Sequence, residues 1–88
     1  MQVYDVRVEL GGPTSDDEVR AGLRAELGAD VAGWLRELDP RVGTTAQGRA
    51  AVELEVSGPD VWTSALTAMA VLRQLDYDLL SLHVESRT

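Results

Sequence analysis

The chain has 88 residues, with 15 Asp and Glu against eight basic residues, all Arg, and a formal net charge of −7 at pH 7. This length allows one small domain with one core. The charge disfavours nucleic acid and anionic lipid, because binding to phosphates depends on Lys and Arg. With no cysteine, disulfides and cysteine-ligated metals are excluded, and a reducing compartment fits.

The lack of recognisable targeting signals also leads us to expect a cytoplasmic protein. The N-terminal residues show no basic stretch followed by an apolar run, as a secretory signal would. No apolar run approaches the roughly 18 residues of a membrane helix, so we expect no membrane partner. Lys, Asn, Ile and Phe are absent and Ala, Arg, Gly, Val and Leu dominate, which indicates a GC-rich genome.

The first predicted element is a strand over residues 2–10. Its even positions are mostly apolar, as at Val6 and Val8, and charged residues lie between them. Side chains of a strand alternate between its two faces, so this pattern indicates a strand packed on one side and solvated on the other. Gly11, Gly12 and Pro13 then end the strand.

A helical region follows. Thr14 or Ser15 can cap it, with Glu18 completing a capping box if Ser15 is the cap. Carboxylates in the first turn complement the positive end of a helix. Gly28 either ends a first helix before a short second one or is tolerated within one helix, and the unbroken apolar stripe favours near-continuity. The acidic first turn is Asp16, Asp17 and Glu18, and the stripe is Val19, Leu23, Leu27, Val31, Trp34 and Leu38.

The second half of the chain repeats this order. Residues 41–45 predict a weak edge strand, and the alternation over 49–57 predicts a strong strand. Asp60 follows Gly58 and Pro59 and begins an amphipathic helix, with Trp62 on the flank of its apolar stripe. Residues 76–78 separate this helix from a last strand over 79–85.

The predicted order is therefore strand, helix, strand, strand, helix, strand, in one α+β domain over residues 1–88. Such a β-α-β-β-α-β order typically forms a ferredoxin-like sandwich, a four-stranded sheet with the helices on one face. We expect the first and third strands to lie parallel at its centre. The expected core is Val6, Val8, Leu23, Leu27, Val52, Leu54, Ala65, Leu72, Leu80 and Leu82.

The solvated side of this sheet is the first candidate interaction surface. We expect an acidic open face, with Arg7 in a cross-strand ion pair. The acidic helix start, Asp16 to Glu18, and an exposed Trp62 are secondary candidates, since Trp is enriched in binding hot spots. The predicted residues of the open face are Asp5, Arg7, Glu9, Glu53, Glu55, His83 and Glu85.

Several functions found on ferredoxin-like domains are excluded, either by these outward residues or by residue types that the chain lacks. An RNA-recognition motif stacks bases on exposed aromatics, and the equivalent positions here are charged. Copper-chaperone-like domains need a Cys-x-x-Cys motif, and acylphosphatases need a catalytic Asn, which the chain lacks. Dimeric monooxygenase-like barrels would have to bury this charged face, at a cost of several kcal/mol per unpaired ion.

Two alternatives stay open at this stage. The loop from Gly11 to Ser15 slightly resembles the ligand-binding turn of amino-acid-sensing ACT domains, which would make the protein a small-molecule sensor. His83 beside Ser81 and Glu85 would be the site of a small enzyme or a metal ion. A single His is a poor metal set, and residues i and i+2 of a strand lie about 7 Å apart, so we expect no catalytic, metal or cofactor site.

The sequence thus favours a small, acidic, non-enzymatic interaction or regulatory module. Its expected partner is a protein with a basic surface, as for an adaptor, an antitoxin or immunity protein, or a phage-encoded inhibitor. A second copy of the chain, forming a homodimer, is a further partner that we consider.

Overall fold

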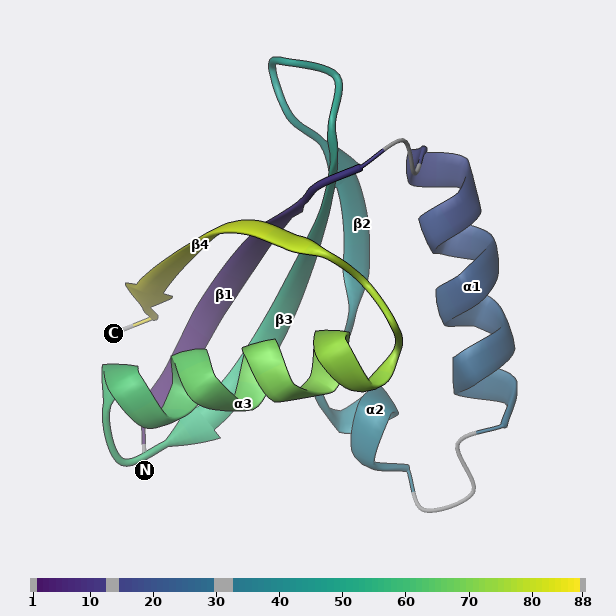
Figure 1. Ribbon diagram of the computed structural model, residues 1–88. Helices are drawn as coiled ribbons and strands as arrows, with labels where there is room; N and C mark the ends of the chain where they lie inside the picture. Colours follow the sequence, from purple (N-terminus) through teal and green to yellow (C-terminus); the bar gives the residue numbers. More distant parts are fainter. Residues whose placement is uncertain (1, 13–14, 30–32, 88) are drawn as a thin grey trace.

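The computed structural model describes residues 2–12, 15–29 and 33–87, which form an α+β fold (Figure 1). One four-stranded antiparallel sheet and three helices make up this described part. In chain order the elements are β1 (Gln2–Leu10), α1 (Asp16–Gly28), α2 (Trp34–Glu37), β2 (Arg41–Thr44), β3 (Ala50–Gly58), α3 (Val61–Gln74) and β4 (Leu79–Ser86).

The strands lie in the order β2-β3-β1-β4, and every neighbouring pair is antiparallel. The two long strands therefore occupy the centre, as expected, but the prediction that they lie parallel is wrong. The connection through α1 and α2 brings β2 into the same direction as β1. The hairpin from β2 to β3 then reverses the chain, so β3 runs opposite to β1.

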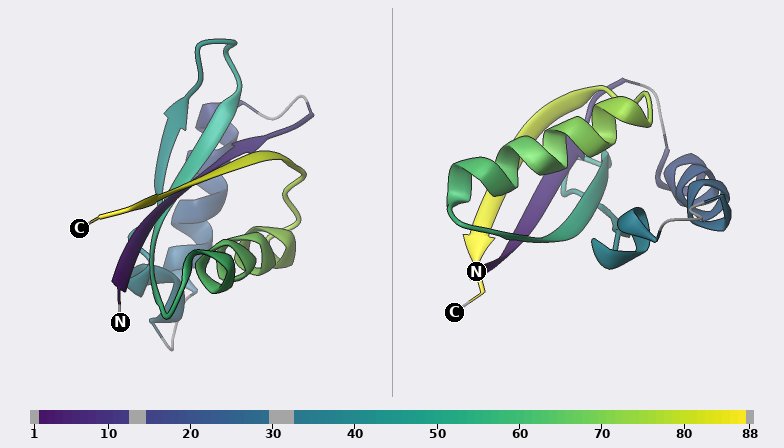
Figure 2. Two further views of the ribbon diagram at one scale, coloured as in Figure 1. Left: turned by 90° about the vertical axis from the view of Figure 1, so that its left-hand side faces the viewer. Right: turned by 90° about the horizontal axis from the view of Figure 1, so that it is seen from below.

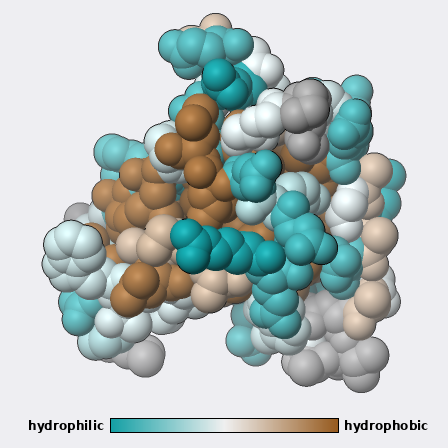
Figure 3. Space-filling view, viewed as in Figure 1, coloured by the Kyte–Doolittle hydropathy of each residue, from teal (hydrophilic) through white to brown (hydrophobic). Residues whose placement is uncertain are grey.

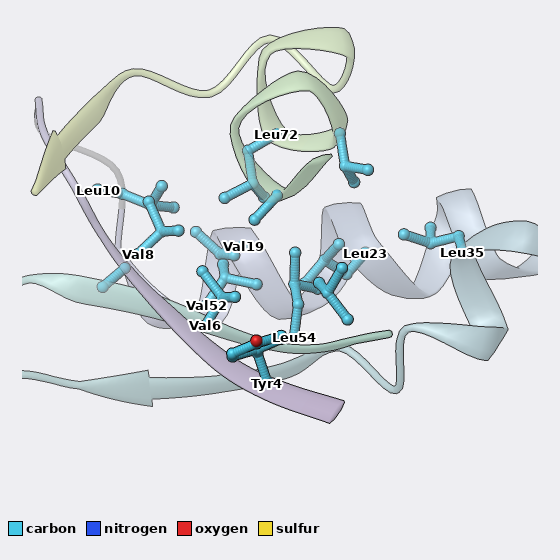
Figure 4. Close-up of a cluster of buried hydrophobic side chains, with 14 residues drawn as sticks. Tyr4, Val6, Val8, Leu10, Val19, Leu23, Leu35, Val52, Leu54 and Leu72 are labelled. Atoms are coloured by element: carbon cyan, nitrogen blue, oxygen red, sulfur yellow. The ribbon is translucent and has the colours of Figure 1, made fainter. Parts of the chain in front are cut away.

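The core lies on the side of the sheet formed by the even-numbered residues of β1 and β3 (Figure 4). Val6, Val8, Val52 and Leu54 are fully buried there, which confirms the predicted alternation. Leu27 and Leu82 are only partly buried against this cluster. All three helices pack on the same side, through Val19 and Leu23 of α1, Leu35 of α2, and Ala68, Val71 and Leu72 of α3.

The helical region breaks near Gly28, so the preference for a near-continuous helix is wrong. Helix α1 ends at Gly28, and α2 begins after Gly33, whose φ of 77° lies in the left-handed region. This turn changes which side chains face the sheet. Leu35 is 1 % exposed, whereas Trp34 is 40 % exposed. Val31, another residue of the predicted apolar stripe, lies outside the described residues.

Both long helices begin at a side-chain cap. The Ser15 hydroxyl accepts a hydrogen bond from the backbone N–H of Glu18 at 3.2 Å, and the Asp60 carboxylate accepts one from Thr63 N–H at 2.7 Å. These contacts satisfy N–H groups that the first turn of a helix leaves unpaired. Both starts were predicted from the sequence, while the alternative cap Thr14 lies outside the described residues.

The last strand departs from the predicted alternation at its start. Ser81 pairs with Glu9, but Leu79 pairs with Leu10, so the register shifts within Leu79–Ser81. An extra residue of this kind re-aims the side chains around it. Leu79 packs against the core and Leu80 is 53 % exposed, which corrects the placement of Leu80 in the core.

Candidate interaction surfaces

The strand register brings the predicted residues of the open face together in rows that cross the sheet. In one row Asp5 on β1 lies opposite both Glu55 on β3 and Glu85 on β4. In the next row Arg7 lies opposite both Glu53 and His83, and Arg41 on β2 lies opposite Glu53. Like charges directly opposite each other on neighbouring strands destabilise a sheet, whereas opposite charges at such positions stabilise it.

Three arginines that the sequence analysis did not assign to this face neutralise much of its charge. Arg87 pairs with both Asp5 and Glu55. Arg41 lies 3.8 Å from Glu53, and Arg49 lies 3.8 Å from Glu9. Of these three, Arg87 can be assigned to the open face from the sequence, because position 87 continues the alternating series 81, 83 and 85.

The open face is therefore almost neutral, not strongly acidic. Arg7 also lies 3.8 Å from Glu53, as the predicted cross-strand pair. Five carboxylates and four guanidinium groups give the face a net charge of −1, and the rest of the chain carries the other −6. The five carboxylates belong to Asp5, Glu9, Glu53, Glu55 and Glu85, and the four guanidinium groups to Arg7, Arg41, Arg49 and Arg87.

The pKa of Arg87 is raised above its ordinary value, first by the hydrogen bond to Asp5 and then by the one to Glu55.

The middle of the open face is hollowed, with a volume of about 380 Å³. The hollow lies between Arg7, Arg41, His83 and Arg87 and the neighbouring carboxylates. The charged groups around this hollow are already paired with one another.

His83 lies beside Glu85, as predicted, with Nε2 at 3.1 Å from the carboxylate. Ser81 donates its hydroxyl to Glu9 on the neighbouring strand at 3.0 Å. Across the described ranges, no group of three His, Asp or Glu side chains converges as metal ligands would. In none of these ranges is a helix long and apolar enough to cross a membrane.

The acidic start of α1 holds two kinds of carboxylate. Asp16 accepts hydrogen bonds from Arg20 at 2.9 Å and from the Thr44 hydroxyl at 3.2 Å, so it ties α1 to β2. Burial acts to raise the pKa of Asp16, but these two hydrogen bonds, the charge of Arg20 and the backbone N–H of Asp17 together hold the pKa below its ordinary value. The Asp17 side chain is 91 % exposed, and Glu18 is exposed as well.

The loop that resembles an ACT-type turn uses one of its backbone donors within the fold. The N–H of Gly11 donates to the carbonyl of Asp78 at 3.0 Å, next to the start of β4. Gly12 has a φ of 79°, a left-handed conformation that favours glycine. Pro13 and Thr14 lie outside the described residues.

Helix α3 exposes apolar side chains at its start. Trp62 is 77 % exposed and Leu66, one turn further, is 60 % exposed, beside the half-exposed Val61. We call these three residues the Trp62 surface. Hydrophobic side chains gather over α3 and β4 on the side of the molecule seen in Figure 3, and the two elements run alongside each other in both Figures 1 and 2.

A second hollow, of about 220 Å³, lies between α1 and β2. Its lining consists of Arg20, Leu23, Arg24, Leu27, Pro40 and Val42. Arg20 also donates to the carbonyl of Val42 at 3.2 Å, so this hollow belongs to the contact that holds α1 against the sheet.

Comparisons of this chain with protein-family models, with curated proteins and with solved structures returned no match.

Proposed function

We propose that this chain is a non-enzymatic protein-binding module, and that it binds its partner through the Trp62 surface. The exposure of Trp62, at 77 %, is the observation that carries this proposal. Large apolar side chains that gather on a surface mark interaction sites, and Trp is among the residues that contribute most to binding energy.

The Trp62 surface is presented by a well-anchored helix. The opposite side of α3 places Ala65, Ala68 and Leu72 in the core, and Asp60 caps its first turn. Because α3 is held in place, docking on Trp62 and Leu66 would require little ordering of the backbone. Low ordering cost leaves more of the binding energy for affinity.

Charge favours a partner with a basic surface. Most of the net negative charge lies outside the open face, and one carboxylate, Asp60, adjoins the Trp62 surface. The N–H of Thr63 holds the pKa of Asp60 below its ordinary value, so this group is ionised at neutral pH. An Arg or Lys of the partner could pair with Asp60 or stack on the face of Trp62, as cations do on indole rings.

We place this module on a ferredoxin-like scaffold in the cytoplasm. Support for the scaffold comes from the central position of β1 and β3, the hairpin between β2 and β3, and the helices packed against one side of the sheet. Support for the compartment comes from the absence of cysteine. The short helix α2 is an addition to the six-element order.

The test compares two tryptophan variants in a pull-down from host extract. Immobilised Trp62→Ala should lose the proteins that the natural chain retains, whereas Trp34→Ala, at the other exposed Trp, should retain them. Raising the salt from about 0.15 M to about 1 M should weaken the binding of a partner that is attracted by charge, since the Debye length falls from about 8 to about 3 Å. Equal retention by Trp62→Ala and the natural chain would contradict the proposal.

The same pair of residues allows a direct optical measurement. Trp34→Phe leaves Trp62 as the only indole of the chain. Binding of a purified partner at the Trp62 surface should then shift the fluorescence emission to shorter wavelength, as the ring leaves water. Binding without any change in emission would place the interface elsewhere.

A further inference from the structure

The edge of the sheet at β4 carries an inference that is independent of the Trp62 surface. We propose that β4 pairs antiparallel with β4 of a second copy of this chain, about a two-fold axis at Val84, so that two sheets join into one.

Among the strands that the structure describes, β4 lies at an edge and pairs with β1 alone, in the order β2-β3-β1-β4. The N–H of Arg87 donates to the carbonyl of Val3 on β1 at 3.1 Å. Alternate residues of an antiparallel strand bond toward the same neighbour. Ser81, His83 and Glu85 therefore bond toward β1, and Leu82 and Val84 direct their N–H and C=O groups outward.

The two edges of the sheet differ in their protection. Strand β2 has only four residues, and α1 covers part of it through the hydrogen bond from Arg20 to the carbonyl of Val42. Strand β4 has eight residues and contains neither Pro nor Lys, which are common devices against pairing at an edge. Its irregularity lies at its start, around Leu80, and leaves the rest of the edge regular.

The regular part of this edge has its midpoint at Val84. Regular pairing with β1 runs from Ser81, opposite Glu9, to Arg87, which bonds Val3. Two copies that overlap over this whole segment place Val84 opposite Val84 of the second copy.

This register also makes the side chains of the open face complementary. It places His83 opposite Glu85 of the second copy, and Ser81 opposite Arg87, and the two-fold axis repeats both pairs. These are non-hydrogen-bonded positions, where the Cα atoms approach to about 4.5 Å and side chains interact most closely.

Neither neighbouring register has this property. A slip in one direction places His83 opposite His83, and a slip in the other places Glu85 opposite Glu85. The first slip loses both contacts between His83 and Glu85 of the other copy. The second places two carboxylates directly opposite each other, which destabilises a strand pair. Full overlap and the pairing of His83 with Glu85 thus select the same register.

Apolar contacts and net charge are compatible with this pairing. Leu82 and Val84 are half-buried beside the core, and a second strand at the edge would cover more of their surface. The net charge of −7 opposes self-association, but the open face contributes only −1 of it. At physiological ionic strength, charges more than about 8 Å apart are largely screened.

The first test is sedimentation equilibrium of the natural chain, followed by oxidation of single-cysteine variants. The chain has no cysteine of its own, so each variant forms only the disulfide under test. In the proposed register the two Val84 Cα atoms lie about 5.5 Å apart, within disulfide reach. Val84→Cys should therefore cross-link, whereas His83→Cys, offset by two residues, should cross-link at least about tenfold more slowly.

The second test exchanges charges without relying on cysteine. His83→Glu should raise the dissociation constant of the dimer by on the order of tenfold. The new carboxylate lies opposite Glu85 of the second copy, and the two-fold axis repeats this unfavourable pair. The double variant His83→Glu with Glu85→His should restore the affinity, since the exchange recreates both opposite pairs. Circular dichroism checks that each variant is folded.

The results divide cleanly. A dimer that cross-links through Val84→Cys and is rescued by the exchange supports the proposal. A monomer at concentrations up to about 1 mM, where binding would be worth only about 4 kcal/mol, overturns it. Equal cross-linking of His83→Cys also overturns it. A dimer lost in Trp62→Ala but kept in His83→Glu would move the contact to α3, whereas failure of the pull-down with an intact β4 dimer would reject only the proposed function.

Discussion

The guanidinium group of Arg87 pairs with Glu55 across the width of β1, two strands away in the sheet. It also pairs with Asp5, which lies between Glu55 and Glu85 in one row. One arginine thus separates carboxylates that would otherwise face one another directly. The charge of the open face is organised by row, so its net value says little about how any one carboxylate is compensated.

Replacing this arginine should destabilise the fold. Arg87→Ala leaves Asp5 and Glu55 opposed without a counter-charge, and like charges at opposed positions are unfavourable. The midpoint of urea denaturation should decrease, and the decrease should become smaller at about 1 M NaCl, because salt screens the repulsion. Arg73→Ala, on α3, is the matched control and should show neither effect. A decrease for Arg87→Ala that salt does not reduce would contradict an electrostatic cause.

The buried leucine of β3 should contribute far more than an exposed leucine of α3. Leu54 is fully buried, so Leu54→Ala should lower the free energy of unfolding by about 2–5 kcal/mol through lost burial and a cavity. Leu66→Ala should change it by no more than about 0.5 kcal/mol, since that side chain is mostly exposed. Chemical denaturation of both variants measures the contrast, and similar losses would argue against the assigned faces.

The irregular start of β4 makes a separate prediction about two adjacent leucines. Leu79 packs against the core, whereas Leu80 points outward. Leu79→Ala should therefore reduce stability more than Leu80→Ala, the reverse of what strict alternation through Leu82 predicts. Thermal unfolding followed by circular dichroism distinguishes the two orders.

The cap of α3 should make part of the stability depend on pH. The pKa of Asp60 is lowered in the folded state from the ordinary 3.8. Its contribution is therefore present above pH 3.8 and is lost as the pH falls through the lower folded-state pKa. Asp60→Asn keeps a capping side chain but cannot titrate. The stability of the natural chain minus that of the variant should be constant above about pH 5 and should decrease below about pH 4.

Nucleic acid should not bind this protein. The net charge is −7, and the arginines of the open face are paired with carboxylates. Fluorescence polarisation with labelled RNA and DNA at about 50 mM salt is a permissive measurement, because low salt favours phosphate contacts. Micromolar binding under those conditions would contradict the prediction and would require that these ion pairs open.

Strand patterns and helix starts were predictable because they depend on local chemistry. The alternation around Val6 and Val52 needs only the two-residue period of a strand, and Ser15 and Asp60 cap their helices through contacts three residues away. In both cases the sequence neighbours that cause the structure are adjacent to it.

Features that depend on distant contacts were not predictable in the same way. The continuity of an apolar stripe does not show that the chain turns before Trp34, so the stripe selected Trp34 where the fold buries Leu35. The register shift near Leu80 arises where β4 meets the end of β1. The near-neutral open face depends on Arg41 and Arg49 reaching carboxylates on other strands.

The pairing of Tyr4 with Ser86 has a consequence for how the fold forms. Strand β1 is made first but occupies the centre of the sheet, and both of its neighbours come from the second half of the chain. The β2–β3 hairpin and α3 can form from contacts close in sequence, whereas β1 must wait for two long-range pairings. Such contacts slow folding because they close large loops. During synthesis, at about 5–20 residues per second, the apolar side of β1 is therefore without its partner strands for several seconds.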